Sequence, residues 1–236
     1  MYVYLKRILS GVTFRLFIEI MLFLSSLLIF IFLSYMIAGE GEKRFDVLAF
    51  QKFDTITSPA LTQFMLGVTF FGSILFLLPA FIILIMWFWI FKKNRRLTQD
   101  VTAIGITSTA ILFSLKAIFQ RSRPDDPLLH AVEGFSFPSG HSFLAFTFFG
   151  VLIYIIADLK MNHRLKWILG ISFFIFASLI AISRIYLKVH FASDVLAGFC
   201  LCIVWLTLSF WIMHRIRRNK IIEPVIAEDV NELQSK

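Results

Sequence analysis

The chain has 236 residues, of which 58% are apolar and 16% are charged, and its mean hydropathy is +0.82. Because a soluble domain carries about 25% charged residues, this composition excludes an ordinary soluble protein and indicates one embedded in a membrane. The formal net charge of +8 does not indicate a nucleic-acid partner, because the basic residues stand in short segments between apolar runs, where they act as topology signals.

The first part of the chain predicts two membrane spans with a surface helix between them. The apolar run 16–38 is longer than the about 7–15 residues of a signal-peptide core, and we interpret it as the first span. Residues 39–60 are polar, but apolar side chains recur among them at helical spacing, which predicts an amphipathic helix on the membrane surface. Residues 61–91 are an apolar run with Pro79 inside it and are expected to form one tilted or kinked span.

Four more apolar runs predict the remaining spans, at residues 101–119, 143–157, 167–187 and 191–213. Six crossings place all basic segments on one side: Lys6, Arg7 and Arg15; Lys92, Lys93, Arg95 and Arg96; Lys160, Arg164 and Lys166; Arg215, Arg217, Arg218 and Lys220. Because basic loops stay in the cytoplasm, we expect both termini to be cytoplasmic. The predicted fold is an all-α integral membrane bundle of six transmembrane helices over residues 1–220, with a short disordered cytoplasmic tail at 221–236.

The chain offers few candidates for a metal site. Cys200 and Cys202 lie two apart in an apolar run and therefore point to different helix faces, which predicts buried thiols rather than a disulfide or a zinc site. Asp125 and Asp126, in the sequence R-P-D-D-P, are interpreted as turn residues. We expect no metal ion and no other cofactor.

The polar stretch 183–194, S-R-I-Y-L-K-V-H-F-A-S-D, joins the fifth span to the sixth. If the chain is helical from Val189, His190 and Asp194 share one face, so the carboxylate can reach a ring nitrogen and select the imidazole tautomer. With the permanent cation of Arg184, this set suits attack on a phosphoryl group. Polar residues at the end of a membrane helix also serve as caps and anchors, so the stretch alone leaves both readings open.

Two further polar groups are expected at the same outer face. A helix that begins at the sequence P-S-G-H presents free N–H groups to an anion. There Gly140 allows close approach, and Ser139 can cap the helix or donate to a phosphate oxygen. His141 is either an interfacial histidine or a catalytic one. Lys116 and Arg123 close the third span, where they can also snorkel to the interface.

Together, the motifs Lys116-x6-Arg123-Pro124, Pro138-Ser139-Gly140-His141 and Ser183-Arg184-x5-His190-x3-Asp194 resemble, at every fixed position, the three-part signature of the type 2 phosphatidic acid phosphatase superfamily. The resemblance implies a metal-independent phosphatase that hydrolyses a membrane lipid mono- or diphosphate at the outer face. By this resemblance, undecaprenyl diphosphate, phosphatidylglycerol phosphate, phosphatidate and lipid A phosphates would all fit the site. It further implies that His190 forms a phosphohistidine, that Asp194 orients it, and that His141 acts as acid and then base. The implied phosphate-binding residues are Lys116, Arg123, Ser139, Gly140 and Arg184.

Other functions remain open. A vanadate site like that of the haloperoxidases of the same superfamily is disfavoured, because those enzymes are soluble whereas this chain has six predicted spans. A lipid-phosphate binder or transporter that uses the same cations without hydrolysis is disfavoured because anion binding needs neither His190 nor His141. A zinc hydrolase is disfavoured by the neighbouring cations. We place lipid selection in the loop 124–138 and the segment 39–60 as a hypothesis, whereas neither the physiological lipid nor the oligomeric state follows from the sequence.

Overall fold

The computed structural model describes residues 2–37, 44–129 and 133–234, and all regular secondary structure within these ranges is helical. Side chains are described for the same ranges except residues 2–13, 15 and 218–234, so the basic side chains predicted at the N-terminus and at the end of the last cluster lie outside them. Six helical segments in the described part are long and apolar enough to cross a membrane, which confirms the predicted number: Leu16–Ile37, Pro59–Phe91, Arg95–Phe119, Gly140–Asp158, His163–Tyr186 and Ala192–Arg217.

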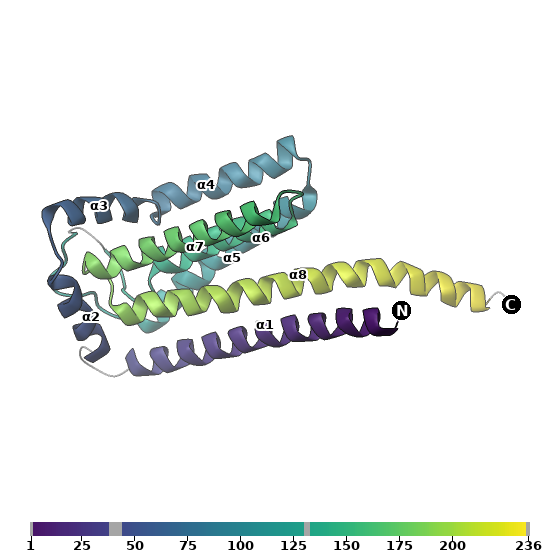
Figure 1. The fold of residues 1–236 in the computed structure, drawn as a ribbon, viewed down its shortest axis with the longest axis horizontal. Coiled ribbons are helices and arrows are strands. Elements are labelled where there is room, and N and C mark those ends of the chain that lie inside the picture. The colour runs from purple at the N-terminus through teal and green to yellow at the C-terminus, as the bar shows by residue number, and fades with distance from the viewer. Residues whose placement is uncertain (1, 38–43, 130–132, 235–236) are drawn as a thin grey trace.

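The long helices run side by side as one bundle (Figure 1). They are α1 (Tyr2–Ile37), α5 (Arg95–Phe119), α6 (Gly140–Asp158), α7 (His163–Tyr186) and α8 (Ala192–Gln234). Helix α6 contacts α4, α5, α7 and α8. In its most apolar stretch of 18 residues, 56% is buried inside the protein, the largest share of any span in the described chain. Its phenylalanines pack against rings of the neighbouring helices, such as Phe199, whose ring centroid lies 4.7 Å from that of Phe146. Helix α6, which begins directly after Ser139, is therefore packed on several neighbouring helices.

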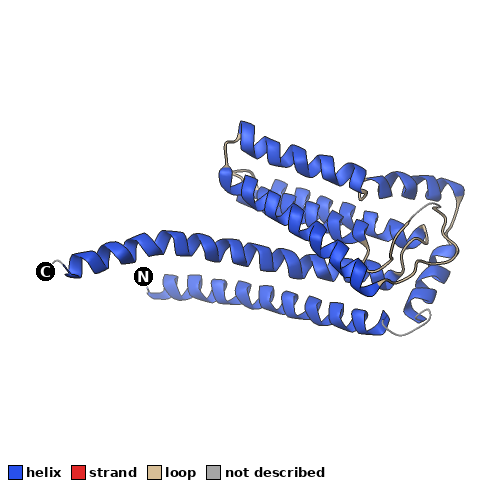
Figure 2. Ribbon diagram, turned by 180° about the vertical axis from the view of Figure 1, so that it is seen from behind, coloured by secondary structure: helices blue, strands red, loops and turns tan. Residues whose placement is uncertain are grey.

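Helix α2 (Arg44–Asp54) lies across one end of the bundle, and the view from behind shows the same arrangement (Figures 1 and 2). This confirms a short helix after the first span, although residues 38–43 lie outside the described part. Helix α2 contacts α7 and α8. The centroid of the Phe50 ring lies 5.7 Å from that of Phe191, and Asp46 is completely buried. One face of the surface helix is therefore packed on the protein.

The second long apolar run forms a single span, which is interrupted after the 12 residues of its first helix. Helix α3 (Pro59–Phe70) and helix α4 (Ile74–Met86) are separated by residues 71–73, and the π-helix η1 (Trp87–Phe91) completes the span. Pro79 lies inside α4, so the break falls elsewhere than at the proline.

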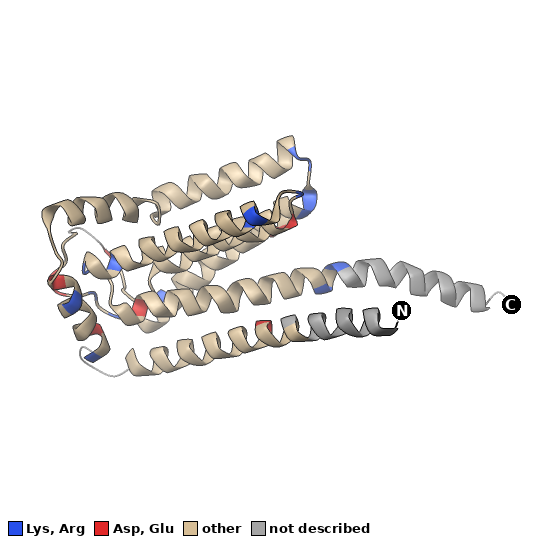
Figure 3. Cartoon of the chain, in the orientation of Figure 1, with Lys and Arg blue, Asp and Glu red and all other residues tan. Residues whose placement is uncertain are grey.

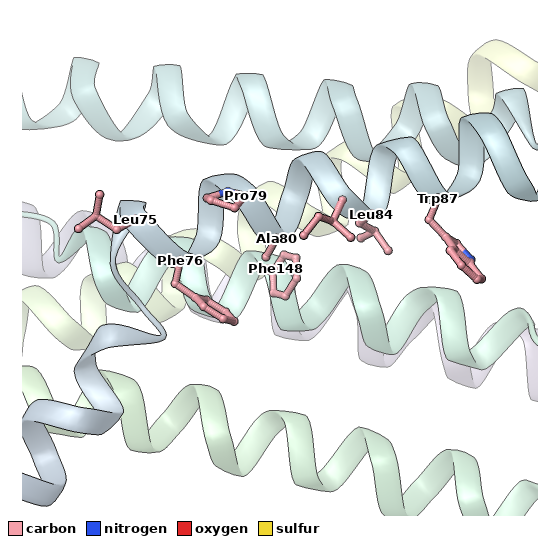
Figure 4. A pocket seen from close by; sticks show the side chains of 8 residues that line it. Leu75, Phe76, Pro79, Ala80, Leu84, Trp87 and Phe148 are labelled. Carbon is pink, nitrogen blue, oxygen red and sulfur yellow. The ribbon is translucent and has the colours of Figure 1, made fainter.

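An apolar groove with a cavity volume of about 430 Å³ follows α4 and includes Phe148 of α6 (Figure 4). Its lining is almost entirely hydrocarbon, so lipid chains are the molecules that match it. The lining residues are Leu75, Phe76, Pro79, Ala80, Ile83, Leu84, Trp87 and Phe148.

The prediction of a disordered tail from residue 221 is wrong for the described residues, because α8 continues as a helix to Gln234. Once a helix is nucleated, each further residue adds a backbone hydrogen bond at little cost, and the segment contains good helix formers such as Ala227 and Leu233. Helix α1 likewise begins at Tyr2, well before the apolar run starts.

Charged residues gather at the two ends of the bundle (Figure 3). The basic segments of the α4–α5 and α6–α7 connections share the end opposite α2 with the described basic residues of α8. The arrangement agrees with the expectation that these segments occupy one side of the membrane.

Candidate active site

Three segments that are distant in the sequence meet at the α2 end of the bundle: the loop after α5, the start of α6 and the α7–α8 connection. The backbone N–H of Ser139 donates to the carbonyl of Asp194 at 3.1 Å, and Ser142 Oγ donates to the carbonyl of Val195 at 2.9 Å. A Cβ atom on Gly198 would lie 2.9 Å from the Ser139 carbonyl oxygen. Glycine thus allows α8 to pack directly on the N-terminus of α6.

Two residues with left-handed backbone conformations redirect the chain into this region. Gln120 (φ 46°) ends α5, with its N–H bonded to the Lys116 carbonyl at 3.0 Å, and Lys188 (φ 53°) follows α7. A non-glycine residue in this conformation costs about 1–2 kcal/mol. The turn at Lys188 is stabilised by an ion pair of 2.7 Å with Asp54 of α2 and by a bond from the N–H of Val189 to the carbonyl of Arg184.

His190 is anchored through Nδ1. This atom lies 3.2 Å from Ser136 Oγ and 3.6 Å from Asp194 Oδ2, and Ser136 Oγ donates to the same carboxylate oxygen at 2.5 Å. Because the serine hydroxyl donates its proton to the hydrogen bond with Asp194, the serine oxygen is free to accept a hydrogen bond from Nδ1–H. The predicted histidine–aspartate relationship is therefore made mainly through Ser136, which the sequence analysis did not identify.

The opposite ring nitrogen, Nε2, faces Arg123 Nη1 at 3.3 Å. A guanidinium group can only donate hydrogen bonds, so this contact requires Nε2 to be unprotonated. Arg123 is held by backbone carbonyls, at 2.8 Å from Val189 O and 2.9 Å from Gly134 O. Both nitrogen contacts indicate the tautomer with the proton on Nδ1 and a lone pair on Nε2.

Burial lowers the pKa of His190 well below its ordinary value, and the positive charges of Arg184, Arg123 and Lys116 lower it further. Burial also lowers the pKa of Arg123, with the Asp194 carboxylate acting in the opposite direction. The imidazole is consequently neutral around pH 7, which is the form that a nucleophile requires.

The other predicted cations approach from two different helices. Lys116 Nζ donates to the carbonyl of Phe135. Arg184 is 2% exposed, donates from Nη1 to Thr69 Oγ1 at 2.7 Å, and has no hydrogen-bond partner for Nε among the described atoms. A Cβ atom on Gly140 would lie 3.9 Å from Lys116 Cε, so this glycine adjoins the lysine. These groups bring donors to the His190 region from α5, α6 and α7.

His141 occupies the first turn of α6, beside the break between α3 and α4. A Cβ atom on Gly72 would lie 3.1 Å from His141 Cδ2 and 2.4 Å from Ile180 Cγ2. Ser139 caps the same turn by accepting a bond of 3.4 Å from the N–H of Ser142. The capping role foreseen for Ser139 is thus present, and the glycine at the break leaves room for the histidine ring.

The proximity of His190 and Asp194 was inferred on the condition that the chain is helical from Val189, and this condition is not met because α8 begins at Ala192. The two residues still come together because Asp194 Oδ2 accepts a bond of 3.0 Å from the N–H of Phe191 and holds the turn before the helix. The two side chains are therefore neighbours because of this turn and not because they share one face of a helix.

Arg121 and Asp46 also belong to this region, and neither was predicted. Arg121 donates from Nη1 to Asp194 Oδ1 at 2.6 Å and from Nη2 to Asp46 Oδ2 at 2.8 Å. Arg121 was detectable as a further basic residue two positions before Arg123. Asp46 gives no such signal, because it stands among the other charged residues of the amphipathic helix.

Among the residues that the structure describes, no three His, Cys, Asp or Glu side chains gather as possible ligands for a metal ion. Cys200 and Cys202 are buried free thiols, as predicted. Asp125 and Asp126 are exposed in a bend after the Arg123–Pro124 pair.

The fold and this site define a multi-pass membrane protein with an anchored, buried imidazole among three cations, of which Arg184 is also buried. Residues 97–218 match the family model described as the PAP2 superfamily. The chain is 34% identical over 165 residues to a phosphatidylglycerophosphatase B from Bacillus subtilis, covering 69% of this chain and 80% of that protein. It is 28% identical over 185 residues to an undecaprenyl-diphosphatase from Sulfolobus acidocaldarius, covering 74% and 83%.

The fold itself has a solved counterpart. The crystal structure of a transmembrane PAP2-type phosphatidylglycerolphosphate phosphatase from Bacillus subtilis matches with a TM-score of 0.74 at 31% identity, over 82% of this chain and 96% of that one. The chain belongs to the PAP2 superfamily, and with these relatives it is a phosphatase of the PAP2 type. The resemblance inferred from the three motifs is confirmed.

Proposed function

We propose that the protein hydrolyses a membrane lipid mono- or diphosphate through a covalent phosphohistidine on His190, without a metal ion. The observation that carries the proposal is the pair of contacts on the imidazole. Nδ1 is anchored toward Ser136 and Asp194, while Nε2 keeps its lone pair beside Arg123. A nucleophile needs this combination of a fixed orientation and an unprotonated nitrogen.

In the first step, Nε2 of His190 attacks phosphorus in line with the leaving lipid oxygen. The new N–P bond forms as the P–O bond breaks, and His141, as its imidazolium, donates a proton to that oxygen. The imidazole of His190 gains positive charge, which the Nδ1–H contacts to Ser136 and the Asp194 carboxylate stabilise.

In the second step, His141 is neutral and accepts a proton from water while the water oxygen attacks phosphorus. The N–P bond breaks, inorganic phosphate leaves and the imidazole of His190 returns to its starting form. The proton that His141 donated in the first step is restored, so both histidines complete a cycle.

The non-bridging phosphate oxygens are proposed to bind the cationic side chains Lys116, Arg123 and Arg184, with Ser139 and the N–H of Gly140 as additional donors. At about 4 Å and an effective dielectric of about 20, one cation attracts a unit negative charge by roughly 4 kcal/mol before desolvation. Three cations can therefore supply the charge stabilisation that Mg²⁺ provides in many phosphoryl-transfer enzymes.

We further propose that the site faces the outer side of the membrane and that both termini are cytoplasmic. The support is the separation of the basic segments from the site by the full length of the bundle, together with the tendency of basic loops to remain in the cytoplasm. The names of the relatives favour phosphatidylglycerol phosphate and undecaprenyl diphosphate as substrates to try first. The loop 124–138 and the segment 39–60 remain our candidates for lipid selection.

The test is phosphate release by purified protein in detergent with excess EDTA, measured for a panel of lipid mono- and diphosphates. Wild-type protein should release phosphate, and His190→Ala should not. His214→Ala is the matched control, because that histidine lies in α8 and bonds to the Phe210 carbonyl at 2.7 Å. Lipid binding without turnover by both wild type and His190→Ala would favour a binder or transporter, and activity only with added zinc would contradict the mechanism.

A further inference from the structure

We propose that Asp46 of the surface helix α2 is a positioning residue for catalysis, which keeps Asp194 effective as the anionic partner of His190 by neutralising Arg121. The inference rests on the proposed function, since it concerns the charge that supports the nucleophile. It adds to the site a residue outside the three motifs and outside the matched segment 97–218.

Both carboxylate oxygens of Asp46 accept hydrogen bonds. Its Oδ1 accepts from the N–H of Ser193 at 2.8 Å, and its Oδ2 accepts from Ser193 Oγ at 2.8 Å and from Arg121 Nη2 at 2.8 Å. The residue is 0% exposed, although it stands in a helix with a polar sequence. A buried carboxylate with this many donors is held in one orientation, and it ties α2 to the residue that immediately precedes Asp194.

Arg121 joins the two carboxylates. It bonds to Asp194 Oδ1 at 2.6 Å, its side chain is 10% exposed, and its guanidinium carbon lies 4.0 Å from the centre of the Phe191 ring. That ring in turn contacts Phe50 of α2. The guanidinium therefore has a fixed place between α2 and the start of α8.

The charges explain why a second carboxylate matters. Arg121 alone would form a neutral pair with Asp194, and the negative potential of Asp194 at the His190 ring would be largely cancelled. With Asp46 the three groups carry a net charge of about −1 when all are ionised, so a negative potential remains at His190 as its ring becomes positive. Because the groups are buried, water screens this effect only weakly.

The first test is Asp46→Asn, which removes the charge while keeping the size of the side chain. We expect kcat to fall about ten- to a hundredfold, the loss that changes in the outer partners of metal-bound histidines usually cause, with KM changed much less. Asp158→Asn is the matched control, because Asp158 is an exposed aspartate at the end of α6 opposite the site. It should keep wild-type kcat.

The second test is the double variant Asp46→Asn with Arg121→Gln, which removes one charge of each sign. The proposal predicts a higher kcat than in Asp46→Asn alone, because Asp194 no longer faces an unbalanced cation. A purely structural role predicts a further loss. Each rate is divided by the concentration of protein that elutes as a monodisperse peak in gel filtration, so misfolded material does not enter the comparison.

Wild-type kcat in Asp46→Asn, or a double variant no more active than the single one, would overturn the inference. The proposed function is judged separately in the same assay by wild-type turnover and its loss in His190→Ala. If those two results hold while Asp46→Asn is fully active, only the role of Asp46 fails.

Discussion

Arg184 of α7 donates a hydrogen bond of 2.7 Å to the hydroxyl of Thr69 in α3. Both residues are buried; the bond is made by Arg184 Nη1, and Nε of the same side chain has no hydrogen-bond partner in the described part of the chain. The Thr69 hydroxyl in a predominantly apolar span therefore orients the guanidinium of Arg184, a predicted phosphate-binding residue. The span containing Thr69 lies outside the segment that matches the family model.

Replacing Thr69 with valine removes this hydroxyl and keeps the shape of the side chain. A hydrogen bond to a charged group contributes about 1.5–3 kcal/mol, so kcat/KM for a lipid phosphate should fall about ten- to a hundredfold. Thr69→Ser keeps the oxygen and should retain most activity. Equal activities of the valine and serine variants would show that Thr69 does not orient Arg184.

Gly72→Ala should damage the site through His141. The new Cβ atom would lie 2.4 Å from Ile180 Cγ2 and 3.1 Å from His141 Cδ2, so the backbone or the histidine ring must move. A displacement of about 1 Å near a reacting group can reduce a rate about a hundredfold. Steady-state kinetics should show the loss mainly in kcat.

The matched control for this change is Gly67→Ala in α3, where a Cβ atom would meet nothing within 4 Å. Alanine is favoured over glycine in a helix, so this variant should keep both its activity and its melting temperature in detergent. If Gly72→Ala were as active as Gly67→Ala, the break would not be needed to seat His141.

Ser136→Ala removes the oxygen that lies between His190 Nδ1 and Asp194 Oδ2. The direct distance between these two atoms is 3.6 Å, longer than a hydrogen bond, so the imidazole would lose its closest anchor. We expect kcat to fall about tenfold or more, by analogy with other outer partners of functional histidines. A rapid-quench measurement of phosphoenzyme formation should show the decrease in the forward step. An unchanged formation rate would mean that Asp194 orients His190 unaided.

The pH dependence of the site follows from the cations around His190. Burial lowers the pKa of His190 most, and the positive charges of Arg184, Arg123 and Lys116 lower it further. The anionic Asp194 faces the ring from α8. In Arg123→Gln the pKa of His190 should rise toward its ordinary value, so more of the imidazole is protonated and inactive at low pH. The ratio of variant to wild-type kcat/KM should therefore decrease from pH 7 to pH 5.

Using this ratio cancels the titration of the substrate phosphate, which is common to both proteins. Lys188→Gln is the control, because Lys188 pairs with Asp54 and is not among the charges that lower the pKa of His190. Its ratio to wild type should be independent of pH. A constant ratio for Arg123→Gln as well would contradict the electrostatic account.

Much of the fold could be predicted because membrane spans have simple requirements. Length, apolar composition and the spacing of basic segments were enough to identify six crossings and to bring Lys116, His141 and His190 to one end of the bundle. The helical tail was missed because the lack of an apolar period says little about a helix that extends an existing one. The break at 71–73 was missed because Pro79 is the more obvious helix-breaking residue, although it lies inside α4.

The supporting residues of the site were harder to predict for a different reason. Thr69 and Gly72 stand in an apolar run, where a threonine or a glycine is ordinary, and their roles depend on the contacts with Arg184 and His141 across helices. Asp46 has the same local pattern as the solvent-facing charges beside it. Only the packing of α2 on the start of α8 shows that its carboxylate is buried.

The central claim is that His190 carries the phosphoryl group during turnover. The most direct measurement is to mix purified protein with a lipid phosphate labelled in its phosphate, in excess EDTA, quench in alkali and map the labelled residue by mass spectrometry. The account predicts an alkali-stable, acid-labile phosphohistidine at His190 that forms and decays at rates compatible with kcat and is absent from His190→Ala. Turnover without any labelled histidine, or a label on another residue, would contradict it.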